Sequence, residues 1–238
     1  MKCSVFANSF VFAVVIMLLS DSPLEAQESD RIEEIRRALK DITSDVPAVL
    51  VPAAGLLQCI GPADREAIPI FVRTLTNARN HAVPRIRSAI ALGSIHADPE
   101  VVVPALKSVL LDQNAELRHV AADALGRFGT DAKPAATSLR KLLKDEHANV
   151  RVAAASSLIL MDESIQDSVK TLAVATRDEN YHLRWMACEG LSSVAPMPGP
   201  DVEAALLQVA DNDDEHPDLR EFARYVVDWI CEVETDKE

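Results

Sequence analysis

Histidine and asparagine recur in one column of the sequence and are the first candidates for metal chemistry. The column is spaced by 33 or 36 residues and reads His81, Asn114, His147, Asn180 and His216. Its three imidazoles fall on alternate copies of a repeating unit. Stacked helices lie about 8–10 Å apart, so these imidazoles would be about 20 Å from one another, whereas Zn²⁺ binds histidine nitrogen at about 2 Å. We therefore expect no metal site and assign the column to turns.

Motifs for catalysis are missing from the sequence. It contains no HExxH, GxSxG, GxGxxG or Walker motif and no CxxC pair, and its six histidines are scattered along the chain. Groups distant in sequence can still converge in a fold. We nevertheless predict no catalytic residue, no cofactor and no enzymatic activity.

An arginine column runs beside the histidine column and could bind anions or make internal pairs. The arginines follow one another at steps of 33, 33, 33 and 36 residues, and four of them have an Asp six positions upstream. Such a fixed pair of opposite charges at a turn favours an intramolecular contact over an anion site. The pairs are Asp112 with Arg118, Asp145 with Arg151, Asp178 with Arg184, and Asp214 with Arg220. Arg85 departs from the pattern, because Arg79 stands six positions before it.

The segments around these arginines have the period of an amphipathic helix. Counting from each Arg, the residues at −1, +3, +7 and +10 are apolar or small, and at 100° per residue they share an arc of about 80°. Leu92, Leu125, Leu158 and Leu191 fill position +7 in four copies. A second apolar pattern precedes each copy, at residues 67–75, 101–111, 135–143, 165–175 and 202–209. We therefore predict two helices per repeat, stacked around one hydrophobic interior.

A weaker copy begins the array and sets the domain bounds. Ala53, Ala54, Leu57 and Ile60 occupy the helix columns, but Leu50 replaces the Arg, as is typical of a terminal repeat. We predict a capping helix over residues 27–45, about six helical pairs over 46–231 and an acidic tail over 232–238.

The consensus D-x-[HN]-x-x-[LV]-R-x-x-A-A-x-x-L resembles HEAT repeats, and among them the phycobilisome-lyase HEAT-like subtype. The resemblance covers residues 46–231. It implies an all-α fold, a right-handed alpha-alpha superhelix, in which the Asp and Arg columns form a ladder of hydrogen bonds linking the turns. It implies little about function, because such repeats serve many unrelated roles.

The N-terminus has the layout of a secretory signal peptide. Lys2 precedes an apolar stretch at residues 10–19, which polar residues and then Leu24, Glu25 and Ala26 follow. The stretch is short of the roughly 20 apolar residues of a membrane span. We expect residues 1–26 to be cleaved, leaving a secreted or periplasmic protein with no membrane contact. An uncleaved N-terminal membrane anchor and an ordinary buried helix are the alternatives.

The distribution of charge along the chain restricts the kinds of partner that it could bind. Residues 46–198 carry 16 basic and 16 acidic side chains, whereas residues 199–238 carry 3 basic and 13 acidic ones. This end would repel a polyanion, which argues against nucleic acid. The segment 211–238 is a solvated end cap or, alternatively, a docking surface for a cationic partner. Cys59, Cys188 and Cys231 lie in apolar helical patterns and are expected to be small buried side chains.

A candidate binding surface follows from the helical wheel. Positions +1, +5 and +8 point away from the apolar arc, and in HEAT-like solenoids the second helices line the concave face. This places Val152, Ile159 and Trp185 in an apolar spot edged by His119, Glu189 and Tyr225. The alternative for Trp185 is packing across a repeat junction; exposed Trp and Tyr in a groove are otherwise typical of binding hot spots.

These observations favour an exported scaffold that binds another protein through its helical surface. A chromophore-lyase-like enzyme or its accessory subunit is the first alternative, and it fits export poorly. A nucleic-acid-binding HEAT protein is the second alternative, and the acidic charge disfavours it.

Overall fold

The computed structural model describes residues 23–44, 47–194 and 200–235, which form twelve α-helices and no β-strand. The predicted signal peptide therefore lies almost wholly outside the described residues. Within the described part, no helix is both long and apolar enough to cross a membrane. The all-α prediction is confirmed.

The chain divides into two compact units after Cys59. The first unit contains α2 (Pro23–Asp41) and α3 (Pro47–Gln58), which pack on each other. Helix α2 covers most of the predicted capping helix, and α3 contains the weak first copy of the repeat. Pro52 lies inside α3.

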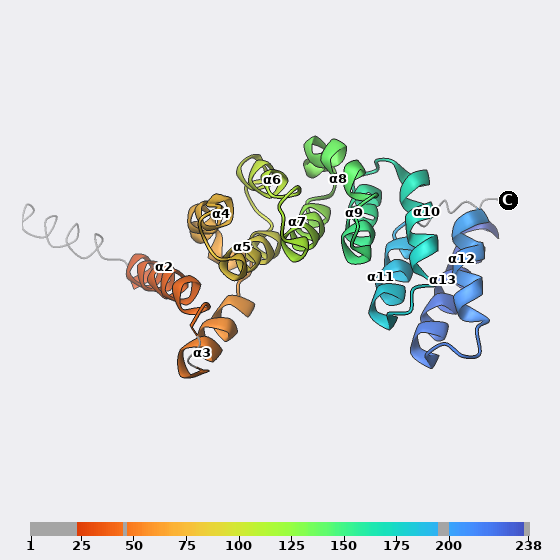
Figure 1. Ribbon diagram of the computed structural model, residues 1–238, viewed down its shortest axis with the longest axis horizontal. Helices are drawn as coiled ribbons and strands as arrows, with labels where there is room; N and C mark the ends of the chain where they lie inside the picture. Colours follow the sequence, from red (N-terminus) through yellow and green to blue (C-terminus); the bar gives the residue numbers. More distant parts are fainter. Residues whose placement is uncertain (1–22, 45–46, 195–199, 236–238) are drawn as a thin grey trace, which may run out of the picture. The chain divides into compact units, whose positions relative to one another are not determined.

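The second unit contains five helical pairs in chain order (Figure 1). Its first helices are α4 (Ile68–Thr76), α6 (Pro99–Ser108), α8 (Ala136–Leu142), α10 (Ile165–Ala175) and α12 (Pro200–Ala210). Its second helices are α5 (Ala82–Ile95), α7 (Ala115–Arg127), α9 (Ala148–Leu160), α11 (Tyr181–Ser192) and α13 (Pro217–Thr235). Two 3₁₀ helices, η1 (Pro62–Ala67) and η2 (Gly129–Ala135), lead into α4 and α8. Each second helix contacts the second helix of the following pair.

Each of the five pairs of this unit contributes buried apolar side chains. Leu92, Leu125, Leu158 and Leu191 are each 0% exposed, which confirms the helical assignment of their column. Small residues, mostly Ala, three and four positions after the Arg in the four repeats that contain these leucines allow the backbones of packed helices to approach one another. At the turns, Asn114 and Asn180 accept backbone N–H groups of α7 and α11 through their side chains, at 3.0 and 2.9 Å, which satisfies otherwise unpaired donors at the helix starts.

Gly126 lies where α7 and α9 approach each other closely. A Cβ atom at this position would lie 2.6 Å from Ser157 Oγ and 3.2 Å from Ser157 Cα. The Ser157 hydroxyl donates a buried hydrogen bond of 2.7 Å to the carbonyl of Ala122 on α7. Only a residue without a side chain fits between this hydroxyl and the helix.

Replacing Gly126 by Ala is therefore expected to lower the free energy of unfolding by about 1–2 kcal/mol. Overpacking costs about 1–3 kcal/mol, and the better helix propensity of Ala returns up to about 1 kcal/mol. The matched control is Gly55→Ala in α3, where a Cβ would meet no atom within 4 Å, so this change should raise stability by about 0.5–1 kcal/mol. Urea unfolding followed by circular dichroism measures both, and a Gly126→Ala variant as stable as the parent would contradict the tight junction.

The cysteines divide between buried and exposed positions. Cys188 is buried as expected, and burial raises the pKa of its thiol to about 12, so it is protonated and unreactive at neutral pH. Cys59 is exposed, so the expectation of burial was wrong there. It follows the last residue of α3, where the helical pattern ends. The side chain of Cys231 lies outside the described residues.

Candidate interaction surface

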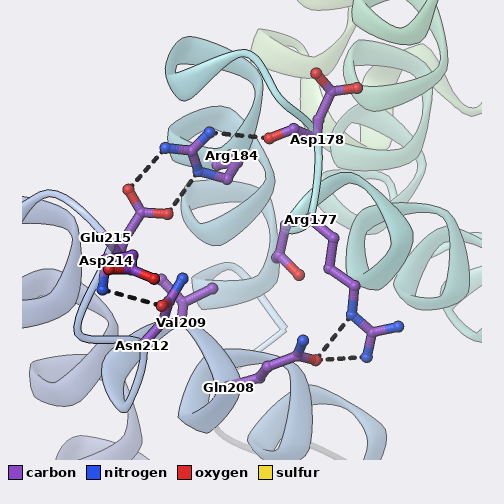
Figure 2. A pocket seen from close by; sticks show the side chains of 9 residues that line it. Arg177, Asp178, Arg184, Gln208, Val209, Asn212, Asp214 and Glu215 are labelled. Carbon is purple, nitrogen blue, oxygen red and sulfur yellow. Dashed lines mark hydrogen bonds and ion pairs between the residues drawn. The ribbon is translucent and has the colours of Figure 1, made fainter.

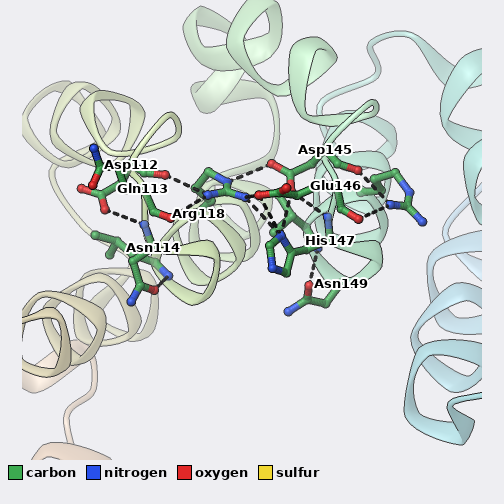
Figure 3. Close-up of polar contacts among 11 residues, drawn as sticks. Asp112, Gln113, Asn114, Arg118, Asp145, Glu146, His147 and Asn149 are labelled. Carbon is green, nitrogen blue, oxygen red and sulfur yellow. Dashed lines mark hydrogen bonds and ion pairs between the residues drawn. The ribbon is translucent and has the colours of Figure 1, made fainter.

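The arginine column forms a ladder along the turns, but its side-chain partners belong to the following repeat (Figure 3). Arg85 donates to Asp112 Oδ2 at 2.8 Å. Arg118 binds both carboxylate oxygens of Asp145, at 2.8 and 2.9 Å, and both side chains are 8% exposed. Arg85 thus forms a rung although it has no Asp six positions upstream.

Within its own repeat each arginine binds backbone instead. Arg118, Arg151 and Arg184 donate to the carbonyl oxygens of Asp112, Asp145 and Asp178, at 2.9, 2.8 and 2.9 Å. The Asp side chains in turn accept the backbone N–H two residues on, at 3.0, 2.9 and 2.9 Å. In these three repeats the Asp six positions before the Arg therefore shapes the turn, and its carbonyl, not its carboxylate, accepts the hydrogen bond from that Arg.

The ladder changes at its C-terminal end. In the described part of the chain no ion pair joins Arg151 to Asp178. Arg184 binds Glu215 through two contacts of 2.5 and 2.8 Å, so Glu215 and not Asp214 forms this rung. The last repeat step is three residues longer, which shifts the turn and places the longer Glu side chain opposite Arg184. Arg220 pairs with Asp213 in its own turn, at 2.9 Å.

The pKa values of the Asp145 and Glu215 carboxyl groups are lowered, which favours their charged form. Burial alone would raise the pKa of the Asp145 carboxyl, but hydrogen bonds from Arg118 and from the His147 backbone N–H hold it below its usual value. The Arg184 guanidinium is the main cause of the lowered pKa of Glu215. These carboxylates stabilise the turns, because their oxygens already accept hydrogen bonds from neighbouring arginine side chains and backbone N–H groups.

A polar pocket of about 340 Å³ lies between the turns of the last two repeats (Figure 2). Its two guanidinium groups are already engaged. Arg184 binds Glu215, and Arg177 Nε donates to the Gln208 side-chain oxygen at 2.8 Å. Its lining residues, all of which are described, include no pairing of a nucleophile with a base. The pocket offers hydrogen bonds but no assembled catalytic group.

The prediction of an exposed apolar spot on the second helices is wrong, because two of its residues are buried. Val152 is 1% and Ile159 7% exposed. Positions +1 and +8 face the next second helix and not solvent, as the contact of Gly126, a +8 residue, with Ser157 of α9 shows. The wheel of one helix could not reveal this, because a helix in a stack is covered on two sides.

Position +5 of the second helices is mostly exposed to solvent. We call the residues at this position the +5 row: Ile90, Asp123, Ser156, Glu189 and Tyr225. Ser156 is half-buried, and the other four are exposed. His119, at +1, is half-buried; burial lowers the pKa of its imidazole, and nearby Asp123 and Glu116 oppose that shift. Of the predicted binding residues, Glu189 and Tyr225 therefore lie exposed.

Trp185 packs across a junction and also belongs to an aromatic cluster. Its ring stacks on Phe222 of α13, with centroids 5.3 Å apart, and lies 6.2 Å from the ring of Tyr181. Tyr181 is itself 5.2 Å from the ring of His216. Sequence reasoning singled out Trp185 and Tyr225 but missed Phe222, Tyr181 and Trp229, although the spacing of Phe222, Tyr225 and Trp229 along one helix was a readable signal.

Comparisons with known proteins agree with this architecture. A designed armadillo repeat protein solved in complex with the peptide (KR)4 matches over 81% of this chain and 98% of its own, with 15% identity and a TM-score of 0.55. The Escherichia coli protein YIBA matches over 91% and 80%, with 16% identity and a TM-score of 0.57. An archaeal HEAT-like repeat protein from Thermococcus onnurineus matches over 87% and 93%, with 17% identity and a TM-score of 0.52.

Other comparisons do not narrow the subtype. The CpcE–CpcF complex of phycocyanin lyase from Nostoc matches with a TM-score of 0.42, which does not single out lyase-type repeats. No curated protein matches the sequence significantly. The family model for HEAT repeats matches residues 68–159 and 136–227. Together these two overlapping matches run from α4 into α13 and cover more than half of the chain, and the protein belongs to the HEAT repeat family.

Proposed function

We propose that the protein is an exported, non-catalytic scaffold that binds another protein along the +5 row of its second helices. The observation that carries this proposal is the row itself. This position is exposed on four of the five second helices, while positions +1 and +8 beside it are buried or half-buried on α5, α7, α9 and α11. A rigid stack that repeats one exposed position suits recognition of an extended partner.

Two further points support binding over catalysis. A solenoid of this fold was solved with a peptide, (KR)4, so helices stacked in this way can hold an extended chain. The polar pocket and the ladder consist of side chains that already satisfy one another. Export rests on the sequence of residues 1–26, with Lys2, the apolar stretch and Ala26.

The binding proposal can be tested with a photo-crosslinking amino acid placed at single positions of the full chain in its native host. We expect adducts with a partner protein from Glu189 in the +5 row. The matched control is Val174 on α10, which is 70% exposed but lies on a first helix. Equal adducts at both positions, or none at Glu189, would contradict binding along the +5 row.

Export has its own test, independent of any partner. N-terminal sequencing of the protein recovered from native cells should begin at Gln27, directly after Ala26. A protein that retains Met1 and partitions with the soluble cell extract would contradict export. Retention of residues 1–26 in the membrane fraction would instead support an N-terminal anchor.

A further inference from the structure

Helix α13 carries aromatic and acidic side chains on a single face. At 100° per residue, six residues of α13 share an arc of about 120°. Phe222, Tyr225 and Trp229 occupy one half of it with Asp218 among them, and Glu221 and Asp228 occupy the other half. We call these six residues the α13 face. Tyr225 is 67% and Trp229 39% exposed. Two large aromatics exposed together on the outer side of one helix are unusual for a solvated end of a domain.

Two positions of the α13 face, +1 and +8, are buried in α9. Val152 and Ile159 fill positions +1 and +8 of α9 and pack among the helices. The corresponding residues of α13 are Glu221 and Asp228, both exposed. The aromatic side of the face continues onto α11, because Phe222 stacks on Trp185.

No basic side chain neutralises this face within the described residues. The two arginines of α13 lie outside this arc on the wheel and pair with carboxylates of the preceding loop, Arg220 with Asp213 at 2.9 Å and Arg224 with Asp211 at 2.5 Å. Glu221 and Asp228 form no ion pair among the described side chains. Among the described side chains, Asp218 pairs only with the exposed ring of His216, at 3.7 Å. The face is thus an uncompensated negative surface beside open aromatic rings.

We propose that the α13 face binds a Lys- or Arg-rich extended segment of the partner protein. Carboxylates and the faces of Tyr and Trp rings both attract ammonium and guanidinium groups. Aliphatic stems of Lys and Arg cover aromatic surface while their charged ends reach carboxylates. The same charges repel nucleic acid, and two copies of this acidic face repel each other. This inference rests on the proposed binding function and names its partner chemistry.

The first measurement titrates the full chain with synthetic octapeptides, using tryptophan fluorescence, to which Trp229 contributes. An alternating Lys-Arg peptide is expected to bind, and an alternating Gly-Ser peptide and an alternating Glu-Asp peptide are not. Affinity should fall by about tenfold or more between about 50 mM and about 500 mM salt, because exposed charges are screened. Equal binding of the three peptides, or binding unaffected by salt, would overturn the inference.

Variants then locate the site. Tyr225→Ala should weaken binding of the Lys-Arg peptide by about fivefold or more, since an aromatic contact is lost. The pair Glu221→Gln and Asp228→Asn should weaken it by about tenfold and flatten the salt dependence. The matched control pair Asp131→Asn and Asp167→Asn removes the same charge from exposed positions elsewhere and should change affinity by less than about twofold. Circular dichroism checks that all variants are folded.

Three outcomes would count against the inference. Losses as large in the control pair would mean diffuse attraction and no site on α13. Unchanged affinity in the Tyr225 and Glu221–Asp228 variants would exclude the face. A dimer in sedimentation that Tyr225→Ala dissociates would assign the face to a second copy. If the Lys-Arg peptide fails to bind while Glu189 still crosslinks a partner, only this inference falls and the proposed function stands.

Discussion

Replacing Arg118 by Ala is expected to lower the free energy of unfolding by about 3 kcal/mol at neutral pH. The change removes two contacts to Asp145, a carboxylate whose side chain is 8% exposed, and leaves that charge unpaired. Breaking a buried ion pair costs about 3–5 kcal/mol. The lower end applies here, because the exposed Glu146 lies beside the guanidinium, at 3.8 Å, and water reaches this edge. Urea unfolding measures the loss.

The control for this prediction is Arg151→Ala, one repeat further on. Arg151 donates to the carbonyls of Asp145 and Glu146, at 2.8 and 3.0 Å, but has no carboxylate pair among the described side chains. We therefore expect a smaller loss of about 1–2 kcal/mol. A second replacement, Asp145→Ala, in the Arg118→Ala protein should recover part of its loss, because it removes the unpaired charge. Equal losses at Arg118 and Arg151 would show that the carboxylate contributes nothing.

Acidification should reduce the difference between the parent and the Arg118→Ala protein. The pKa of Asp145 is lowered in the folded parent, so its stabilising contribution is complete above the unfolded carboxyl pKa, 3.8, and is lost as pH falls through the folded value. In the variant, protonation of Asp145 removes the unpaired charge. The gap in unfolding free energy should be clearly smaller near about pH 3 than near about pH 7. A gap that does not change with pH would refute the ion pair as its source.

Replacing Leu158 by Ala is the second change with a large expected effect, a loss of about 3 kcal/mol. Leu158 is 0% exposed in α9, and truncating a buried Leu costs about 2–5 kcal/mol through lost transfer energy and the cavity left behind. Because each repeat is held mainly by its neighbours, weakening α9 should also separate the unfolding of the helices before it from that of the helices after it. A broadened or two-step urea transition would report this separation.

Leu160→Ala is the matched control, since Leu160 lies two residues away on the same helix and is 48% exposed. It should change stability by less than about 0.5 kcal/mol. Similar losses for the two leucines would mean that the side of α9 bearing Leu158 is not the interior. The comparison thus tests the helical register of this repeat directly.

Much of the fold could be predicted from the sequence alone. The apolar column containing Leu92, Leu125, Leu158 and Leu191 placed both the helices and their buried side. The position of Asn114 and Asn180 at turns followed from the same spacing. These predictions succeeded because each depends on the geometry of one helix or one turn, and a periodic sequence records that geometry in every copy.

Predictions about contacts between repeats were less successful. Val152 and Ile159 were assigned to the surface because the wheel of an isolated helix shows only one buried side. The partner of Arg184 was expected to be Asp178 of its own repeat, but the Arg184 side chain binds Glu215 of the next repeat. Such contacts depend on the distance and rotation between neighbouring helices, which no single copy of the repeat contains.

The sequence by itself determined that this protein is a stack of helical pairs of the HEAT type with a repeating interior and an acidic C-terminal end. Only the tertiary structure decided which carboxylate each arginine binds, that positions +1 and +8 close against the next helix, and that Phe222 stacks on Trp185 while Tyr225 and Trp229 stay open. The physical reason is that helix period and charge are local properties of the chain, whereas exposure depends on which neighbour covers each face.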